Sequence, residues 1–235
     1  MNKLLFIAAL TLAGAPVSEL HSAPAARASL TVQRKSHPEK RGPAARGDTA
    51  SPWEASYSAE AAGKFDTALS ALALLPSGQR DCYLAEFRRG WLQYRLGHYA
   101  ESVTAYRSAV SKEPGAIEAR VALLLPLMAA SKWNDVTQTA EAVLQIDPEN
   151  YLALQRLAFA KFSTQHFAEA ETLYRRLLVL YPSDVEMRAG LGWTVLRMGK
   201  QAQAAALFSQ VLEVAVSHAS AVRGLQAARG QKAEN

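Results

Sequence analysis

The side chains that most often carry out chemistry in proteins are scattered along this chain of 235 residues without a catalytic arrangement. No two histidines stand three to five residues apart, and no CxxC occurs, so a zinc site has no support in the sequence. The glycines form neither a GxGxxG motif nor a P-loop for phosphate groups. The five histidines are His21, His37, His98, His166 and His218. We therefore predict no catalytic residues, no metal and no cofactor, and a protein that is not an enzyme.

The other reactive groups are best explained as parts of the fold. Cys82 is the only cysteine, so it cannot form an internal disulfide, and we expect it to pack as a small hydrophobic residue. Pairing with a cysteine of another molecule stays open for it. Carboxylates such as Glu169 and Glu171 fall on the expected outer faces of helices, where solvation is the default.

The middle of the chain contains five copies of one sequence pattern, which follow one another without insertion or deletion. Prolines that close three of the copies recur at a fixed interval. A fixed period of this length indicates a solenoid, in which stacked helix pairs bury a continuous core. The closing prolines are Pro114, Pro148 and Pro182. The turn positions are Gly63, Gly97, Ser131, Gln165 and Gly199, and the aromatic residues two positions later are Phe65, Tyr99, Trp133 and Phe167.

Two further columns complete the pattern. Seven positions before each turn, the mostly small residues are Ser56, Gly90, Leu124, Ala158 and Gly192. Nine positions after each turn stand Leu72, Tyr106, Ala140, Tyr174 and Phe208. Together these columns resemble the tetratricopeptide repeat (TPR) family, and GWLQYRLGHYAESVTAYRSAVSKEP (90–114) is the best single match. The resemblance is specific for fold and nearly silent on function.

The resemblance implies an all-α protein, a right-handed α-solenoid of about five helix pairs that ends in a C-terminal capping helix. The repeats are expected at about 49–82, 83–116, 117–150, 151–184 and 185–218, with the cap at 218–230. Apolar spacing and capping signals predict helices at 52–62, 64–75, 82–95, 98–111, 116–130, 133–146, 149–163, 166–180, 184–197, 200–214 and 218–229. Pro126 should kink its helix and leave one carbonyl unpaired, at a cost of about 3 kcal/mol unless packing or water compensates.

Residues 1–25 have the pattern of a secretory signal peptide. An apolar run from Leu4 to Ala15 follows one lysine and is too short to cross a bilayer. Cleavage after Ala25 and cleavage after Ala28 both stay open, and an uncleaved anchor is the alternative. Residues 26–50 are rich in Ala, Pro, Ser, Arg and Lys, which predicts a disordered basic linker. The expected location of this exported bacterial protein is the periplasm or the outside of the cell.

The positive charge of the chain lies mostly in this N-terminal part. Residues 1–48 hold seven Lys or Arg against three Asp or Glu, whereas the remainder holds 19 against 18. A repeat body so close to neutral disfavours nucleic-acid binding. Contact with a membrane is expected only through the N-terminal segment.

In the TPR family the first helix of each pair lines the concave side, so the resemblance implies an aromatic groove flanked by arginines. Its residues are Trp53, Tyr57, Phe87, Arg88, Trp91, Tyr94, Arg95, Leu125, Met128, Arg156, Phe159, Phe162, Trp193 and Arg197. Aromatic and arginine side chains are enriched in binding hot spots. The alternative is that several of these aromatics are buried between repeats. The asparagine and lysine set of the family's carboxylate clamp is not matched.

Two functions follow from these features. The first is a non-catalytic adaptor of the cell envelope, which binds a segment of a partner protein in the concave groove. The second is a tethering or spacer module, in which the basic tail binds anionic lipid or an envelope polymer through Arg34, Lys35, Lys40, Arg41 and Arg46. High salt separates the two, because it releases a polybasic tail but not an apolar contact. The linker itself could also fill the groove, and the oligomeric state stays open.

Overall fold

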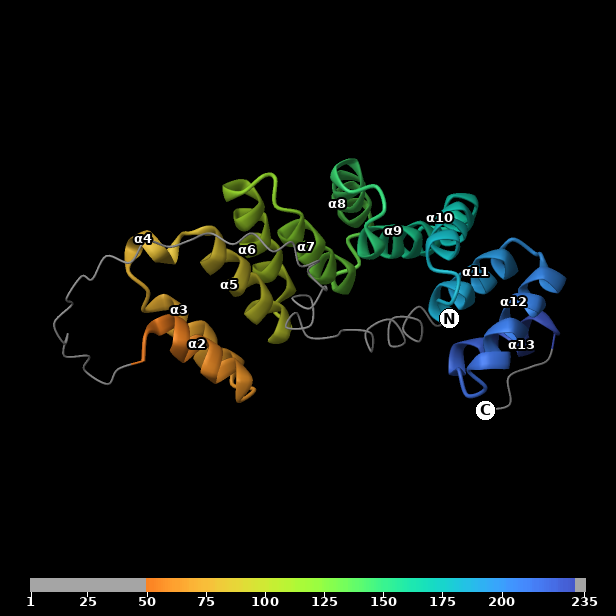
Figure 1. The fold of residues 1–235 in the computed structure, drawn as a ribbon, viewed down its shortest axis with the longest axis horizontal. Helices are drawn as coiled ribbons and strands as arrows, with labels where there is room; N and C mark the ends of the chain where they lie inside the picture. The colour runs from red at the N-terminus through yellow and green to blue at the C-terminus, as the bar shows by residue number, and fades with distance from the viewer. Residues whose placement is uncertain (1–49, 231–235) are drawn as a thin grey trace, which may run out of the picture. The chain divides into compact units, whose positions relative to one another are not determined.

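The computed structural model describes residues 50–230, so the predicted signal peptide and nearly all of the predicted linker lie outside the described residues. Within this range the chain forms twelve α-helices and no strand (Figure 1), as the repeat pattern predicts. Their bounds are α2 Pro52–Ala61, α3 Phe65–Ala73, α4 Ser77–Arg80, α5 Tyr83–Arg95, α6 Tyr99–Lys112, α7 Ile117–Ala129, α8 Trp133–Ile146, α9 Tyr151–Ser163, α10 Phe167–Leu180, α11 Val185–Arg197, α12 Gln201–Val214 and α13 Ala219–Ala228. The ends of each predicted helix agree with these bounds to within two positions. Only the single turn α4 has no predicted counterpart.

The turn inside each helix pair closes through one residue with a left-handed backbone, as the turn column predicts. Glycine supplies this conformation in three pairs, and Ser131 and Gln165 adopt it with φ of 54° and 65°. The left-handed residue lets the chain satisfy the last carbonyls of the first helix. In the second pair, the Gly97 amide donates to Tyr94 O at 3.0 Å and the His98 amide donates to Gln93 O at 2.9 Å.

The pairs stack so that their first helices face the inside of a curved stack. α5 contacts α7, α7 contacts α9, α9 contacts α11 and α11 contacts α13. In the described chain, each second helix packs against the first helix of its own pair and the first helix of the next pair. Within residues 50–230, no two successive second helices contact each other as extensively as these successive first helices do. A stack whose members approach more closely on one side curves toward that side. We call the surface presented by α2, α5, α7, α9 and α11 the inner face.

Aromatic side chains of the second helices interlock with glycines of the first helices. A Cβ atom added at Gly90 would lie 2.8 Å from the ring of Tyr106, which is fully buried in the same pair. Phe208 lies between Gly192 of its own pair and Gly224 of α13, where added Cβ atoms would lie 2.7 and 2.3 Å from the ring. These two glycines stand equally far before and after Phe208 in the sequence. The repeat pattern therefore carries a rule of shape: a ring on a second helix requires small residues at these positions on both neighbouring first helices.

One repeat reverses this arrangement. The second-helix position in α8 is Ala140, and the corresponding first-helix positions before and after it are Leu124 and Arg156. Both residues are large, whereas the equivalent positions around a second-helix ring hold small residues. The absence of a ring at Ala140 leaves room for them. Arg88 follows the same rule, because the second-helix residue before it is Leu72, which has no ring.

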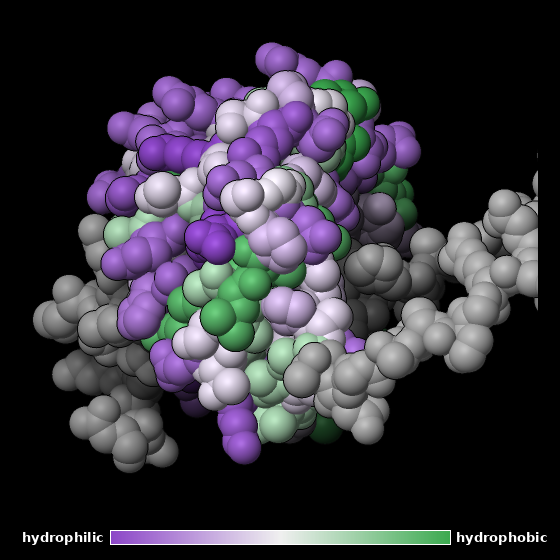
Figure 2. All heavy atoms as spheres, turned by 90° about the vertical axis from the view of Figure 1, so that its left-hand side faces the viewer, coloured by the Kyte–Doolittle hydropathy of each residue, from purple (hydrophilic) through white to green (hydrophobic). Residues whose placement is uncertain are grey.

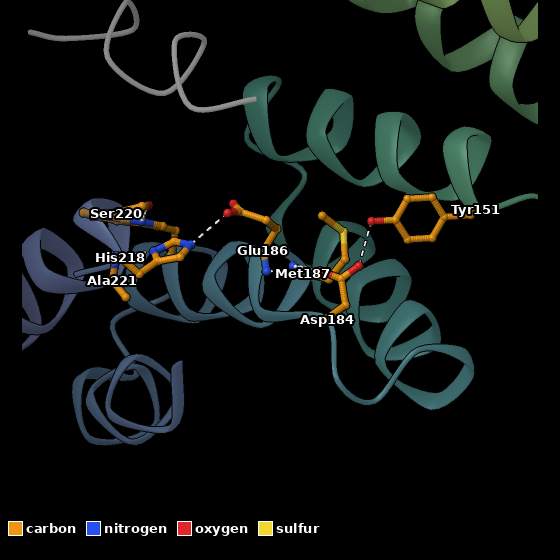
Figure 3. Close-up of polar contacts among 8 residues, drawn as sticks. Tyr151, Asp184, Glu186, Met187, His218, Ser220 and Ala221 are labelled. Atoms are coloured by element: carbon orange, nitrogen blue, oxygen red, sulfur yellow. Dashed lines mark hydrogen bonds and ion pairs between the residues drawn. The ribbon is translucent and has the colours of Figure 1, made fainter. Parts of the chain in front are cut away.

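Polar contacts tie successive repeats together where the later first helices begin (Figure 3). Tyr151 OH donates to Asp184 Oδ2 at 2.6 Å, while Asp184 Oδ1 caps α11. His218 caps α13 because its Nδ1 accepts the Ala221 amide at 3.1 Å. Its proton therefore sits on Nε2, which contacts Glu186 Oε1 at 2.9 Å. These contacts join the start of α9 to that of α11 and the start of α11 to that of α13.

The end of the stack that carries α2 and α3 faces the viewer in Figure 2. On the visible described surface, hydrophobic residues form small groups among hydrophilic ones rather than one continuous layer. The large exposed apolar side chains of this end include Leu74, which is 75% exposed, and Tyr57, which is 50% exposed. This end alone does not present a broad apolar patch.

The interlock predicts the effect of adding one methyl group. Gly90→Ala should lower the free energy of unfolding, because overpacking a core costs about 1–3 kcal/mol. The better helix propensity of alanine returns at most about 1 kcal/mol of this loss. Gly78→Ala is the matched control, since Gly78 also lies in a helix and an added Cβ would meet nothing within 4 Å. Denaturant unfolding of both variants measures the difference, and equal stabilities would contradict the interlock.

Candidate functional site

Two searches bear on the chemistry of the described chain. Residues 50–230 contain no group of three or more His, Cys, Asp or Glu that could hold a metal ion. Over the same residues, none of the helices combines the length and the apolar character that crossing a membrane requires. Cys82 is a free, partly buried thiol at the start of α5.

All of the predicted binding residues lie on the first helices, which form the inner face. They differ in burial. Arg88 and Phe159 are each only 5% exposed, so these two lie beneath the inner face rather than on its surface. Tyr57, Arg95 and Arg197 are exposed, and the others are half-buried: Trp53, Phe87, Trp91, Tyr94, Leu125, Met128, Arg156, Phe162 and Trp193.

Arg88 is held by a carboxylate of the preceding repeat. Its Nη1 donates to Glu60 Oε2 at 2.7 Å, and its Nε donates to Ser56 Oγ at 2.8 Å. The other oxygen of Glu60 accepts the Trp91 indole N–H at 2.5 Å. The ring of Tyr57 covers the guanidinium at 3.5 Å from its centroid. Glu60 is not among the predicted site residues, although its position one repeat before Tyr94 places a polar residue in an otherwise apolar column.

Arg95 and Arg197 stack on the aromatic residues that follow the turns of the preceding repeats. The Arg95 guanidinium lies 4.2 Å from the ring centroid of Phe65, and that of Arg197 lies 5.1 Å from that of Phe167. The two contacts are equivalent, because both partners of the second contact stand three repeats after those of the first. Such exposed contacts stabilise by about 0.5–1 kcal/mol. These arginines therefore join repeats to one another.

Several inner-face aromatics pack on one side against other rings. The Trp91 and Tyr94 rings stack at 6.0 Å, and Phe162 meets Phe167 edge to face at 5.7 Å. Trp193 packs against Phe208 at 5.3 Å. Its indole N–H donates to Ser220 Oγ at 2.9 Å. Each of these rings therefore helps to pack the stack. The half-buried rings among them are also partly exposed on the first helices.

Arg156 is the arginine of this set that has neither a described carboxylate nor a stacked ring beside it. Its Nη1 donates to the backbone oxygen of Val121 at 2.6 Å. Within residues 50–230, no carboxylate lies within 4 Å of it and no ring lies beneath its guanidinium. Burial lowers the pKa of Arg156 to about 10, and the nearby Tyr94 and Tyr106 oppose this shift. At neutral pH the side chain is a charged and largely desolvated cation.

The contact with Val121 lies beside the proline of α7. This helix runs without interruption from Ile117 to Ala129 with Pro126 inside it. Proline lacks an N–H group, so the Ala122 carbonyl four positions earlier loses its helical donor. Arg156 donates to the adjacent carbonyl of Val121 and not to that of Ala122, so this contact does not replace the donor that Pro126 removes. The predicted bend at Pro126 stays a prediction.

The comparisons with known proteins agree with this architecture. Models of the tetratricopeptide repeat family match residues 54–117 and 127–186. Among solved structures, MamA (41-end) from Desulfovibrio magneticus RS-1 is 20% identical, with a TM-score of 0.65 and coverage of 69% of this chain and 92% of that one. A thermophilic TPR protein in Thermus thermophilus is 16% identical, with a TM-score of 0.55 and coverage of 76% of this chain and 97% of that one. No curated protein sequence gives a match. At these identities, the similarity of structure shows the fold alone.

The Glu60 contacts predict a large difference between two ion pairs. Glu60→Ala should lower the free energy of unfolding by about 2 kcal/mol, because it leaves the buried guanidinium of Arg88 and the Trp91 N–H without their acceptor. A fully buried pair would cost about 3–5 kcal/mol, but the Glu60 side chain is 23% exposed. Asp135→Ala breaks the exposed pair with Arg107 and should cost less than about 1 kcal/mol. Chemical denaturation compares the two, and equal losses would show that Glu60 is not a structural carboxylate.

Proposed function

Since the chain belongs to the tetratricopeptide repeat family, we propose that it is a non-catalytic interaction scaffold of the cell envelope, which binds a segment of a partner protein on its inner face. The fold supports protein–protein interaction as the general role. The binding face, the kind of partner and the location are the specific parts of the proposal.

Two apolar columns on the inner face carry the proposal. One runs through Trp91, Leu125, Phe159 and Trp193, of which Phe159 lies beneath the surface, and the other through Tyr94, Met128, Phe162 and Leu196. Successive members of a column are one repeat period apart and lie on α5, α7, α9 and α11, which contact one another in this order. Most of these side chains are only half-buried by the fold. A contiguous group of partly exposed apolar side chains usually marks an interaction site.

The geometry of the two columns fits an elongated partner segment. Successive first helices present equivalent positions at a regular spacing, so side chains of one extended or helical segment can contact several repeats at once. The aromatic residues offer large contact areas, and anchors of this type dominate the energy of protein interfaces. The near-neutral charge of the repeat body leaves apolar contact as the main source of affinity.

The location rests on the sequence of the N-terminal segment. A short apolar run followed by small residues is typical of a signal peptide, so the proposed site of action is the periplasm or the cell exterior. The predicted basic linker of residues 26–50 precedes the repeats. A tether that binds through this linker is the competing function.

The test compares partner retention by variants of the inner and outer faces. Tyr94→Ser with Leu125→Ser removes one anchor from each apolar column and should weaken binding at least about tenfold. The control is Leu74→Ser with Val179→Ser, which changes two side chains that are 75% and 81% exposed on second helices or their ends. The full chain is used to retain partners from envelope extract at low and high salt, after circular dichroism confirms that each variant is folded.

A partner that survives high salt, stays with the outer-face variant and is lost with the inner-face variant supports the proposal. A partner that both variants retain and high salt releases would assign binding to the basic N-terminal segment.

A further inference from the structure

The internal repeats allow one arginine site to be compared with another in the same chain. Two repeat periods separate Arg88 from Arg156, so they occupy equivalent positions on α5 and α9. At the first site the preceding repeat supplies Glu60, whose carboxylate takes hydrogen bonds from Arg88 at 2.7 Å and from Trp91 at 2.5 Å. The Arg88 site is thus an occupied carboxylate site, with its ligand supplied from within the chain.

The second site keeps the arginine but lacks the carboxylate. The position equivalent to Glu60 is Met128, and the position equivalent to Trp91 is Phe159. Arg156 therefore has apolar and aromatic residues at the positions where Arg88 finds an acid and an indole N–H. One of its nitrogens contacts Val121 O. The guanidinium has five N–H donors, so this contact leaves most of its hydrogen-bonding capacity unused.

A desolvated charge without a counter-ion raises the free energy of the folded state. No described carboxylate lies within 4 Å of Arg156, and it retains partial exposure at the inner face. The neighbouring Tyr106 hydroxyl is buried without a hydrogen-bond partner. A ligand carboxylate at this place would recover the pairing free energy that Glu60 provides at the first site.

We propose that Arg156 is a receptor for an Asp or Glu side chain of the partner segment, which takes the place that Glu60 occupies at Arg88. The inference rests on the proposed function, because the acidic residue belongs to a segment lying on the two apolar columns. It defines the partner chemistry as an apolar or aromatic sequence interrupted by one carboxylate that faces α7 and α9.

The charge of the site also selects among occupants. The chain's own linker carries Arg27, Arg34, Lys35, Lys40, Arg41 and Arg46 against Glu39 and Asp48. A segment so basic would place like charges near Arg156, which disfavours it as the occupant. A partner segment with a net negative charge is complementary to the same site.

The experiment selects random twelve-residue peptides that bind the full chain and then synthesises matched pairs. In each pair, the Asp or Glu of a selected peptide is replaced by the isosteric Asn or Gln. The acidic peptide should bind wild type roughly ten- to a hundredfold more tightly than its amide version, as expected for hydrogen bonds to a charged group. In Arg156→Met this ratio should fall to about one.

A second variant tests the site without removing the arginine. Met128→Glu supplies an internal carboxylate at the position equivalent to Glu60, so it should compete with the acidic peptide and bring the acid-to-amide ratio close to one. It should also raise Tm, because Arg156 gains the partner that Arg88 already has. Met128→Gln is the control, because glutamine is similar in size to glutamate and carries no charge. This variant should still bind the acidic peptide more tightly than its amide version. This comparison decides the matter if Arg156→Met does not fold.

The outcomes separate this inference from the function on which it rests. If no peptide binds, or if bound peptides survive Tyr94→Ser with Leu125→Ser, the proposed function fails and the inference fails with it. If peptides bind the inner face without preference for acid, or if the preference is unchanged in both Arg156→Met and Met128→Glu, the Arg156 site is overturned and the scaffold function stands.

Discussion

The structure depends on one packing constraint, the interlock of aromatic rings on second helices with small residues on the first helices around them. Tyr106 and Phe208 are fully buried, and added Cβ atoms at the facing glycines would lie 2.3–2.9 Å from their rings. Because the interlocking residues stand equally far before and after the ring in the sequence, the constraint fixes both the packing within a pair and the packing between pairs. The solenoid follows from its recurrence in successive repeats.

The proposed acid-binding site lies where the constraint is relaxed. Ala140 supplies no ring in the third pair, so the facing position on α9 holds Arg156 instead of a small residue. The other three arginines of the predicted binding set contact residues of the fold: Arg88 contacts Glu60, Arg95 contacts Phe65 and Arg197 contacts Phe167. Arg88 and Arg156 thus both stand where the preceding second helix supplies no ring, and of these two Arg156 lacks a described carboxylate partner.

The sequence predicts the parts of this fold that repeat. Left-handed turns at Ser131 and Gln165 are predicted by their register, although neither residue is glycine. The burial of Phe159 and the capture of Arg88 by Glu60 could not be predicted, because each depends on which side chain the neighbouring repeat presents across a tight interface. A periodic pattern gives the position of a residue on its helix and not its partner. The short α4 was missed because a single turn has no apolar period to detect.

The most direct measurement of the central claim is amide hydrogen exchange of the full chain, with and without a bound partner segment. Occupation of the inner face should slow exchange in α5, α7 and α9 and leave α6, α8 and α10 nearly unchanged, since ligand binding suppresses local opening of the helices that it contacts. Protection confined to the second helices, or to residues 26–48, would contradict the account.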